Sequence, residues 1–504
     1  MIVLDAAGMR SLDAREAAER GEVTLMREAG AALAALVPRY AREQRIIAVA
    51  GPGNNGGDAF AALAELPRAY DRIVYALPAQ RESAARKDAV ARAKAGGVEI
   101  RTFERAADLH GLAGAGLILD GILGVGSRLP LAAPLDGAVE AINASGAPVL
   151  AIDLPSGIDA SNGTRAMPCV QATATLTVGA LKLGLLLDPA RENVGDLWLA
   201  PIGFPPAYEG VVAHVLDDAE FRALVPPRPQ NAEKRKAGAP LVLAGSEQFP
   251  GAAVLCALGA ARAGAGYVTV VIPERAAPAL RMHLIEQTIV TYDPRDVEAS
   301  VETIVDISRR YGSLAIGPGL GAADEMGTIV REVIRRLDLP MAIDATGLFH
   351  LAKHLDVLHR KRAVITPHAG EFGRLSGKGT VAEEQRIARL RAFVQEHNVV
   401  TLLKGRATLV YDGLALHVNT TGTSALATAG TGDVLTGVIG TLLSQGLSPV
   451  DAARAAAYWH GIAGQLAAKK RPIGVIAGDV IDALGEAYLH RSETIPEPEV
   501  MRIG

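Results

Sequence analysis

The sequence predicts an α/β fold in two domains, each built around a mostly parallel sheet. Short apolar, β-branched segments alternate with longer alanine-rich segments along the whole chain, which is the pattern of strand–helix–strand units. The chain has 504 residues, more than one hydrophobic core normally serves. Its composition, 49% hydrophobic and 21% charged, suits helices packed tightly on sheets and is too apolar for a disordered chain.

The expected strands fall into two groups that are separated by a proline-rich segment. In the first half they are 45–50, 72–77, 98–103, 116–120, 148–153 and 174–178. In the second half they are 240–244, 267–272, 314–316, 342–344, 363–366, 399–403 and 408–411. The segment 203–238 has five prolines and a basic cluster, a composition that opposes regular structure. We therefore predict domains at 1–215 and 216–504, and a frayed tail at 493–500.

Composition and charge argue against several classes of protein. The formal net charge is −4, so no excess of basic residues indicates a nucleic-acid binder. The two cysteines, Cys169 and Cys256, have neither metal-ligand spacing nor a disulfide pattern. The first residues are too charged for a signal peptide, and no apolar run of about 18 residues is convincing as a membrane span. We expect a cytoplasmic protein that binds small molecules, not a membrane.

A glycine-rich loop follows the first expected strand of the first domain. After strand 45–50 comes the segment GPGNNGGD at 51–58, and then an alanine-rich helical stretch. Glycines let the backbone approach a ligand, and the free N–H groups at a helix start favour an anion. An ordinary redox dinucleotide site fits badly, because Leu77 and Pro78 stand where its acidic residue is expected. A tight turn without a ligand is the alternative interpretation.

Two further strands of this domain end in carboxylates. Asp120 closes strand 116–120, and Asp153 closes strand 148–153 just before the segment LPSGID. The carboxyl ends of parallel strands meet in the crevice where open α/β sheets bind ligands, so these side chains can converge with the loop asparagines. Asp, Asn and Ser oxygens would also suit a hard cation. For each carboxylate alone, a helix cap is the alternative.

Three segments, GPGNNGGDA, DGILGVG and DLPSGIDASNG, occur in the order found in the NAD(P)H-hydrate epimerase domain, which residues 1–200 resemble. The resemblance implies a Rossmann-like three-layer fold, Asp153 as the catalytic acid/base, and K⁺ held by Asn55, Asp120 and Ser156. Residues implied to hold the hydrated nucleotide, NADHX or NADPHX, are Asn54, Asn55, Gly56, Gly57, Asp58, Gly124, Val125, Gly126, Ser127, Arg128, Leu129, Pro130 and Asp153. The chain departs from the family pattern at Ala59, where Gly is usual, and at Gly121, where Ala is common.

The strongest motif of the second domain is GTSALATAGTGD at 422–433, which precedes an apolar helical stretch. Gly430 and Gly432 would free N–H groups at the helix start, which is a suitable anion hole for a transferring phosphoryl group. Asp433 stands beside this position and could accept a hydroxyl proton. An acidic residue at a helix start is often only an N-cap, which is the alternative.

This motif resembles the G-x-G-D element of the ribokinase-like superfamily, and further segments between about 230 and 490 resemble its ADP-dependent (S)-NAD(P)H-hydrate dehydratase branch. They are GPGLG at 317–321, IDATGL at 343–348, TPHAGEF at 366–372 and LKGRAT at 403–408. The resemblance implies a ribokinase-like α/β fold, with Asp433 as general base and ADP with Mg²⁺ as co-substrate. Residues implied to line the hydrate pocket are Ala252, Gly319, His368 and Asp433. Residues implied to hold ADP are Lys404, Gly405, Arg406, Ala407, Thr408 and Gly432. Asp344 and Glu371 are expected as pocket residues or helix caps.

Both resemblances together predict a metabolite repair enzyme that epimerises hydrated NAD(P)H and dehydrates the S form at the expense of ADP. They also imply a homo-oligomer. Two alternatives stay open. The second domain could be a kinase for a vitamin-type alcohol, in which case ATP and not ADP would support activity. The first domain could be a non-catalytic binding module, although the low basic content argues against RNA as its ligand.

Overall fold

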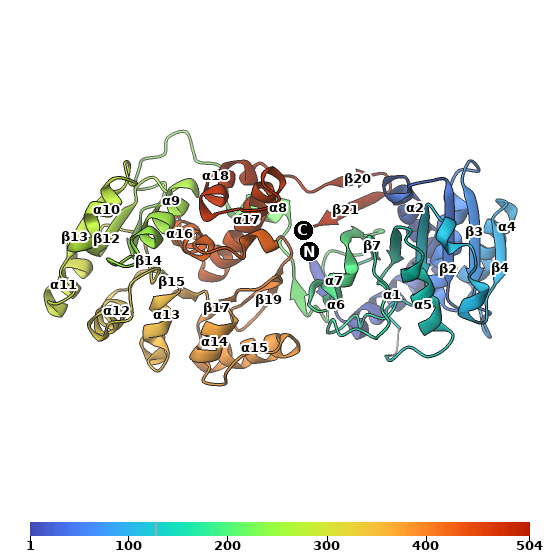
Figure 1. Cartoon of the computed structure of the whole chain (residues 1–504), viewed down its shortest axis with the longest axis horizontal. Coiled ribbons are helices and arrows are strands. Elements are labelled where there is room, and N and C mark those ends of the chain that lie inside the picture. Colours follow the sequence, from blue (N-terminus) through green and yellow to red (C-terminus); the bar gives the residue numbers. More distant parts are fainter. Residues whose placement is uncertain (127–128) are drawn as a thin grey trace. The chain divides into compact units, whose positions relative to one another are not determined.

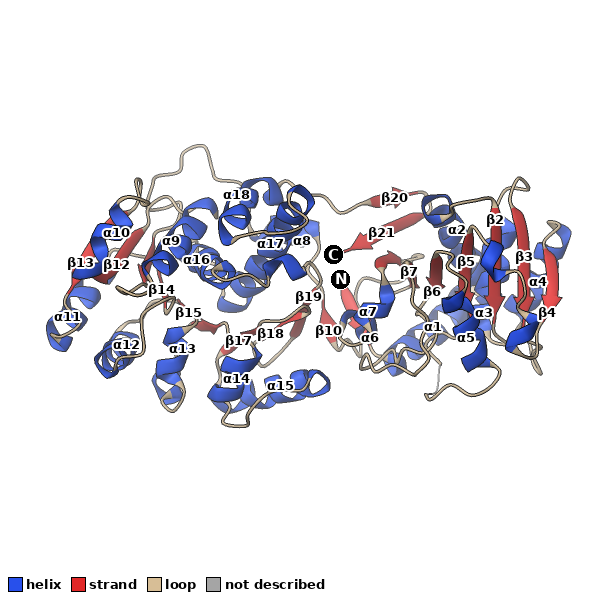
Figure 2. Ribbon diagram, in the orientation of Figure 1, coloured by secondary structure: helices blue, strands red, loops and turns tan. Residues whose placement is uncertain are grey.

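The chain folds into two compact units in a computed structural model that describes residues 1–126 and 129–504 (Figure 1). The first unit comprises Met1–His214 together with Ser492–Gly504, and the second comprises Val215–Arg491. Each unit has helices packed on a mostly parallel sheet, which confirms the predicted α/β class (Figure 2). Within the described ranges, every helix is too short or too polar to cross a membrane.

The first unit is built on a nine-stranded sheet with the order β20-β21-β9-β7-β6-β5-β2-β3-β4. The seven strands from β9 to β4 run parallel, and their register places Val49 opposite Tyr75 on one side and Asp120 on the other. The strands are β2 (Arg45–Ala50), β3 (Asp71–Ala76), β4 (Glu99–Thr102), β5 (Leu117–Gly121), β6 (Val149–Ile152), β7 (Ala174–Val178), β9 (Asp196–Ala200), β20 (Thr494–Pro496) and β21 (Glu499–Ile503). Beside it, β1 (Ile2–Leu4) pairs with β8 (Leu181–Lys182) and β10 (Ala213–His214).

Helices cover both faces of this sheet, so the unit has three layers. Ile46, Ala48 and Ala50 of β2 pack in one core cluster with residues of α2, α3 and α4, whereas Ile47 and Val49 pack with α5 on the other face. This alternation follows from the two-residue side-chain period of a strand. The helices are α1 (Ala6–Arg20), α2 (Glu22–Tyr40), α3 (Asn54–Glu65), α4 (Ala84–Ala95), α5 (Leu135–Ala144), α6 (Leu183–Leu186) and α7 (Arg191–Val194).

The C-terminal tail corrects the sequence-based prediction. We predicted a frayed end that belongs to the second domain, but β20 and β21 extend the sheet of the first unit. Strand β21 pairs antiparallel with β9, where Met501 lies opposite Leu199, and Val500 is buried in the core. Pro496 is tolerated because β20 forms the edge of the sheet, where a strand need not donate every N–H.

The strands of the second unit run in the order β13-β12-β11-β14-β15-β16-β17-β18-β19. They are parallel as far as β17, after which β18 and β19 form an antiparallel meander. The strands are β11 (Pro240–Leu243), β12 (Thr269–Pro273), β13 (Thr288–Tyr292), β14 (Ser313–Ile316), β15 (Met341–Ile343), β16 (Ala363–Ile365), β17 (Val400–Leu403), β18 (Thr408–Tyr411) and β19 (Leu416–Asn419).

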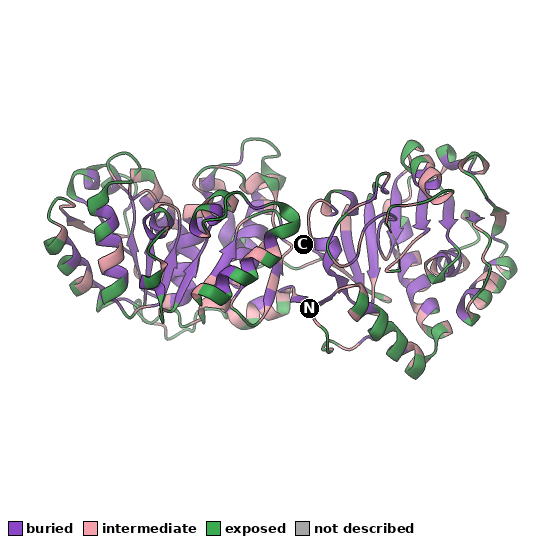
Figure 3. Ribbon diagram, turned by 90° about the horizontal axis from the view of Figure 1, so that it is seen from below, coloured by how far each residue is buried: buried purple, intermediate pink, exposed green. Residues whose placement is uncertain are grey.

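Helices α9, α16, α17 and α18 pack together over this sheet, and α11 to α15 lie on its other face (Figure 1). The strands between them are buried, while the outer helix faces are exposed (Figure 3). The helices are α8 (Asp218–Leu224), α9 (Pro250–Arg262), α10 (Ala277–Arg281), α11 (Val297–Ser308), α12 (Asp324–Arg336), α13 (Thr346–Leu351), α14 (Ala369–Leu375), α15 (Arg386–His397), α16 (Thr431–Ser444), α17 (Pro449–Lys470) and α18 (Ala477–Tyr488).

Candidate active sites

The glycine-rich loop of the first unit connects β2 to the start of α3. No side chain caps this helix, whose N-cap is Gly53, so its first N–H groups remain available to a ligand. The loop needs its glycines, because a Cβ on Gly51 would lie 1.9 Å from the Ile122 carbonyl oxygen, and one on Gly56 would lie 2.1 Å from that of Gly51. Asn54 is held by Ser83, whose hydroxyl donates to its Oδ1 at 2.8 Å.

Asp120, at the end of β5, is fully buried and bonded to Ser156. Its Oδ2 accepts from the Ser156 backbone N–H at 2.8 Å, and its Oδ1 accepts from the Ser156 hydroxyl at 2.7 Å. Burial raises the pKa of Asp120 to about 6. Leu123 N–H donates to the Ser156 hydroxyl at 3.0 Å, and the next residue, Gly124, lies against the Asn55 side chain. The three predicted cation ligands, Asn55, Asp120 and Ser156, thus lie around the segment 120–124 at one end of β5.

Asp153 follows β6 in a left-handed backbone conformation, with φ of +68°. Its Oδ1 accepts from Lys182 Nζ at 2.5 Å and from Val178 N–H at 3.3 Å. The Lys182 side chain is only 1% exposed, so this is a buried ion pair. The sequence analysis missed Lys182, although a lysine inside the apolar run LKLG is itself a signal that it has a buried partner.

A cavity of about 550 Å³ joins these groups. The predicted residues that line it are Asn54, Asn55, Asp58, Gly124, Val125, Gly126 and Asp153. Gly56 and Gly57 are buried beneath it, and the described lining does not include Leu129 or Pro130. Ser127 and Arg128 lie outside the described residues. Asp13 of α1 and Lys182 also line the cavity, and neither was predicted.

The first cavity holds more carboxylates than cations to neutralise them. Asp13, Asp58 and Asp153 interact electrostatically with one another and with Lys182. Desolvation by the surrounding protein, reinforced by Asp153 and Asp13, raises the pKa of Asp58 well above its usual range. Desolvation likewise raises the pKa of Asp13 to about 6, with Lys182 opposing the shift. Protonated and ionised carboxyl groups can therefore coexist in this cavity near neutral pH.

The second site lies where α16 begins. Gly430, the N-cap, has a φ of +90°, and Asp433 follows in the first turn of the helix. A Cβ on Gly432 would lie 3.4 Å from both Lys404 Nζ and Asp344 Oδ2, so this turn is packed against a charged pair. The helix start, the lysine and the carboxylates therefore face one region.

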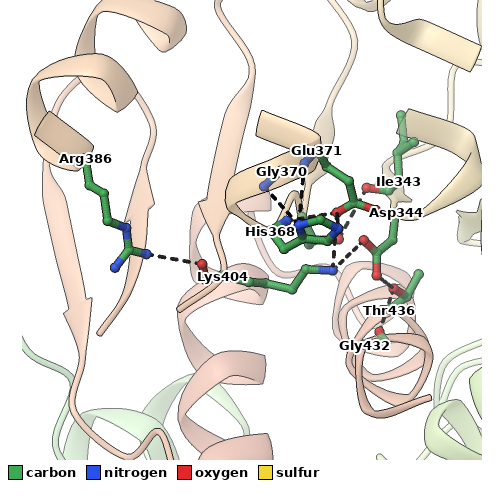
Figure 4. Close-up of polar contacts among 10 residues, drawn as sticks. Ile343, Asp344, His368, Gly370, Glu371, Arg386, Lys404, Gly432 and Thr436 are labelled. Atoms are coloured by element: carbon green, nitrogen blue, oxygen red, sulfur yellow. Dashed lines mark hydrogen bonds and ion pairs between the residues drawn. The ribbon is translucent and has the colours of Figure 1, made fainter. Parts of the chain in front are cut away.

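Lys404 is the centre of a polar network that Figure 4 shows. Its Nζ donates to Asp344 Oδ1 at 2.8 Å and lies 3.9 Å from Glu371 Oε2, while the Thr436 hydroxyl donates to Asp344 Oδ2 at 3.0 Å. Burial opposes the charge of Lys404, but Asp344 and Glu371 outweigh it and raise the lysine pKa. Burial also raises the pKa of Asp433 to about 7, with further contributions from Asp344 and Glu371 and opposition from Lys404.

His368 and Glu371 form a reciprocal cap at the start of α14 (Figure 4). His368 Nδ1 accepts from Gly370 N–H at 3.0 Å, and Glu371 Oε2 accepts from His368 N–H at 2.9 Å. Glu371 thus caps the helix, which is one of its two expected roles, and its carboxylate lies beside Lys404. The His368 side chain is 61% exposed and can contact a ligand while it caps.

A cavity of about 930 Å³ adjoins this network. Predicted residues that line it are His368, Lys404, Gly405, Arg406, Thr408 and Gly432. Ala407 is buried below it. Three predicted residues, Ala252, Gly319 and Asp433, are not in the described lining of this cavity. Ala252 and Gly319 lie against each other, since a Cβ on Gly319 would be 2.8 Å from the Cβ of Ala252. The lining also includes His460, which was not predicted. Burial lowers the pKa of His460 to about 4.

The comparisons with known proteins cover both units. Residues 22–184 match the family described as YjeF-related protein N-terminus, and residues 240–485 match the family described as NAD(P)H-hydrate dehydratase. The chain is 37% identical to the bifunctional NAD(P)H-hydrate repair enzyme Nnr of Pyrobaculum aerophilum, over 92% of this chain and 93% of that one. It is 33% identical to the protein of the same name from Moorella thermoacetica, over 96% of each chain. Among solved structures, a ribokinase-like superfamily protein of Enterococcus faecalis shares the fold, with a TM-score of 0.50 and 23% identity over 56% of this chain and 98% of that one.

Proposed function

The chain belongs to the family of bifunctional NAD(P)H-hydrate repair enzymes, and we propose that its two units carry the two activities at separate sites. The first unit interconverts the R and S forms of hydrated NADH and NADPH. The second dehydrates the S form at the expense of ADP. The observation that carries this proposal is that each unit combines an open helix start with a carboxylate beside a lysine: Asp153 with the buried Lys182, and Asp433 beside the partly buried Lys404.

At the first site, we assign Asp153 as the group that gives and takes a proton at the C6 hydroxyl of the hydrate. The ring nitrogen expels this hydroxyl when a proton reaches its oxygen, so the C6–O bond breaks and water leaves. Water then adds to the other face of C6 and returns a proton to the carboxylate. A positioned carboxylate serves both steps. Lys182 fixes its direction, because it bonds to Asp153 Oδ1 and to the Val178 carbonyl at 2.6 Å.

The oxygen atoms of Asn55, Asp120 and Ser156 fit a K⁺ ion. The donors that bond to Asp120 in the described structure are uncharged N–H and O–H groups. A cation would compensate the buried Asp120 charge and favour its ionised form. All three ligands are hard oxygen donors, as an alkali cation prefers. Bound K⁺ would supply a fixed positive charge beside the nucleotide loop.

At the second site, we assign Asp433 as the general base. It takes the hydroxyl proton of the hydrate while the β-phosphoryl group of ADP moves to that oxygen, so one O–P bond forms and the bond to AMP breaks. Phosphate is a better leaving group than hydroxide. Its departure from C6, with loss of a proton from C5, restores the dihydropyridine ring. Lys404 and the N–H groups at the start of α16 stabilise the charge on the phosphoryl group.

Mg²⁺ accompanies ADP and is bound mainly by phosphate oxygens. The described site also offers carboxylates beside Lys404, those of Asp344 and Glu371, as possible ligands. Bound Mg²⁺ would neutralise phosphate charge. The cavity residues Gly405, Arg406 and Thr408 would hold the nucleotide on the other side of Lys404.

Separate variants test the two assignments with purified R and S hydrates. We expect Asp433→Asn to abolish ADP-dependent return of reduced-nicotinamide absorbance while R and S still equilibrate. Asp153→Ala should block use of the R form beyond its spontaneous rate and leave the S form a good substrate. Equal loss of both activities in either variant would contradict two independent sites. Activity with ATP but never with ADP would instead favour the vitamin-kinase alternative.

A further inference from the structure

Two arginines are buried directly behind the two ligand loops. Arg86 of α4 is 3% exposed, and its Nη1 donates to the carbonyl oxygens of Gly51 at 2.8 Å and of Gly53 at 2.9 Å. A Cβ on Gly56 would lie 2.6 Å from this Nη1, so the loop is closed tightly over the guanidinium. Glu82 lies 3.3 Å from the Arg86 Nε and balances its charge.

The second unit repeats this arrangement with Arg386 of α15, which is 4% exposed. Its Nη2 donates to the carbonyl oxygens of Leu403 at 3.3 Å and of Lys404 at 3.2 Å, and the latter contact is drawn in Figure 4. Glu383 lies 3.1 Å from its Nη1. A Cβ on Gly405 would lie 2.4 Å from Nη2, so the backbone of Gly405 lies directly against this guanidinium.

Fixing a carbonyl also fixes the next N–H group. In a trans peptide the C=O of one residue and the N–H of the next point in opposite directions. When Arg86 binds the Gly53 carbonyl, the Asn54 N–H is therefore directed away from Arg86. Likewise, the bond to the Lys404 carbonyl directs the Gly405 N–H away from Arg386. Asn54 and Gly405 both line the cavities described above.

We infer that Arg86 and Arg386 are positioning residues that orient the ligand-binding N–H groups of Asn54 and Gly405 without touching the ligand. The inference rests on the proposed function, which places nucleotide groups in both cavities. A guanidinium suits this task, because its donors point in fixed directions within a rigid plane, whereas an ammonium is a compact charge on a flexible stem. Binding of an anion by these N–H groups would depend on the direction that each arginine sets.

The chain offers a matched control for each arginine. Arg72 is 6% exposed and donates to the carbonyl oxygens of Leu63 at 3.1 Å and Leu66 at 2.8 Å, at the far end of α3 from the ligand loop. Arg389, on the same helix as Arg386, donates to the Thr380 and Gly379 carbonyl oxygens at 3.0 and 3.1 Å. Neither control residue lines the described part of either active-site cavity.

The decisive comparison is between R386Q and R389Q in the full chain. ADP affinity is measured by titration calorimetry, and KM and kcat are measured with the S hydrate. Losing one well-directed hydrogen bond to a charged phosphate weakens binding roughly tenfold to 100-fold, so we expect R386Q to raise Kd and KM for ADP by about this factor. R389Q should lower the melting temperature about as much as R386Q does. It should leave Kd and KM for ADP within about twofold of the wild-type values, since the Arg389 hydrogen bonds are made to residues that do not line the cavity. Equal constants in R386Q and wild type would overturn the inference.

The first site gives an independent test. We expect R86Q to raise KM for the R hydrate and to leave ADP-dependent use of the S hydrate unchanged, whereas R72Q should change neither. If a glutamine variant fails to fold, R86K and R386K replace it and should show a weaker defect of the same kind, because lysine keeps the charge but not the planar donor array. Normal KM in folded lysine and glutamine variants would overturn the inference. Wild-type protein that binds ADP but repairs neither epimer would instead refute the proposed function alone, because the binding comparison needs no turnover.

Discussion

Adding one methyl group at Gly121 should destabilise the first unit and slow its reaction. A Cβ there would lie 2.9 Å from the Cβ of Ala59, 3.1 Å from the Asn55 carbonyl oxygen and 3.4 Å from Ile152 Cδ1. Carbon atoms pack best at about 3.5–4.0 Å, so the new methyl overlaps its neighbours. Overpacking of this kind costs about 1–3 kcal/mol, which for a unit of this size lowers the melting temperature by roughly 2–12 °C.

Ala59 and Gly121, the two positions at which we expect a departure from the family pattern, face each other, and we predict that they compensate. Ala59→Gly alone should cost about 2 kcal/mol, from roughly 0.8 for the buried methyl and about 1 for glycine in a helix. In that background Gly121→Ala refills the space and should be neutral or stabilising, which gives a coupling energy of about 1–3 kcal/mol. Calorimetry of the full chain measures all four forms, and R-hydrate turnover should follow the same order. Additivity of the two substitutions within about 0.5 kcal/mol would refute the reasoning.

Three further predictions concern charge and chain topology. Because Asp433 acts in its ionised form and burial raises its pKa to about 7, the dehydratase rate should rise with pH through about 7. E371Q removes a charge that raises this pKa, so it should move the rising part of the pH–rate profile to lower pH. A shift of the profile to higher pH would contradict the assignment. K182Q should slow R-to-S conversion at least about tenfold, since a charged hydrogen bond contributes about 1.5–3 kcal/mol. It should leave dehydration of the S hydrate intact. An unchanged epimerisation rate would contradict the role of the buried Asp153–Lys182 pair. Deletion of 492–504 should destabilise the first unit by roughly 3–6 kcal/mol, because the buried side chains of Val500 and Ile503 are lost. Amide exchange in β9 should become faster, because β9 loses its pairing with β21. Unchanged exchange in β9 would show that this pairing is absent.

Local patterns predicted the two α/β units and most central strands, because buried parallel strands are continuous apolar runs. The expected strands 45–50, 174–178 and 408–411 coincide with β2, β7 and β18. Several edge and short strands escaped detection, although the edge strand β4 was predicted at 98–103, and the buried strand β9 was missed as well. β13 is only partly buried, β8 has two residues, and β21 pairs with a strand that lies some 300 positions earlier in the chain, which no local pattern reveals.

In the candidate sites, too, local motifs could be found from the sequence, whereas contacts between distant residues could not. Asp153 and Asp433 could be identified because each belongs to a contiguous motif beside glycines. The ion pairs near them could not be predicted from the sequence, since Lys182 reaches Asp153 from β8, and Lys404 reaches Asp344, next to Asp433 in the site, from the loop after β17. Asp13 comes from α1, far from any motif. The gathering of these charges depends on strand order, which positions residues that are distant in sequence around one cavity.

The most direct test of two cooperating sites uses wild-type protein with the R hydrate alone. Protein, Mg²⁺, K⁺ and ADP are added, and the return of reduced-nicotinamide absorbance is followed against the spontaneous rate. The account predicts complete recovery that requires ADP, because R must first become S and S must then lose water. Absence of recovery from R, when S is repaired under the same conditions, would contradict an active first site, and recovery without ADP would contradict the assigned role of the second.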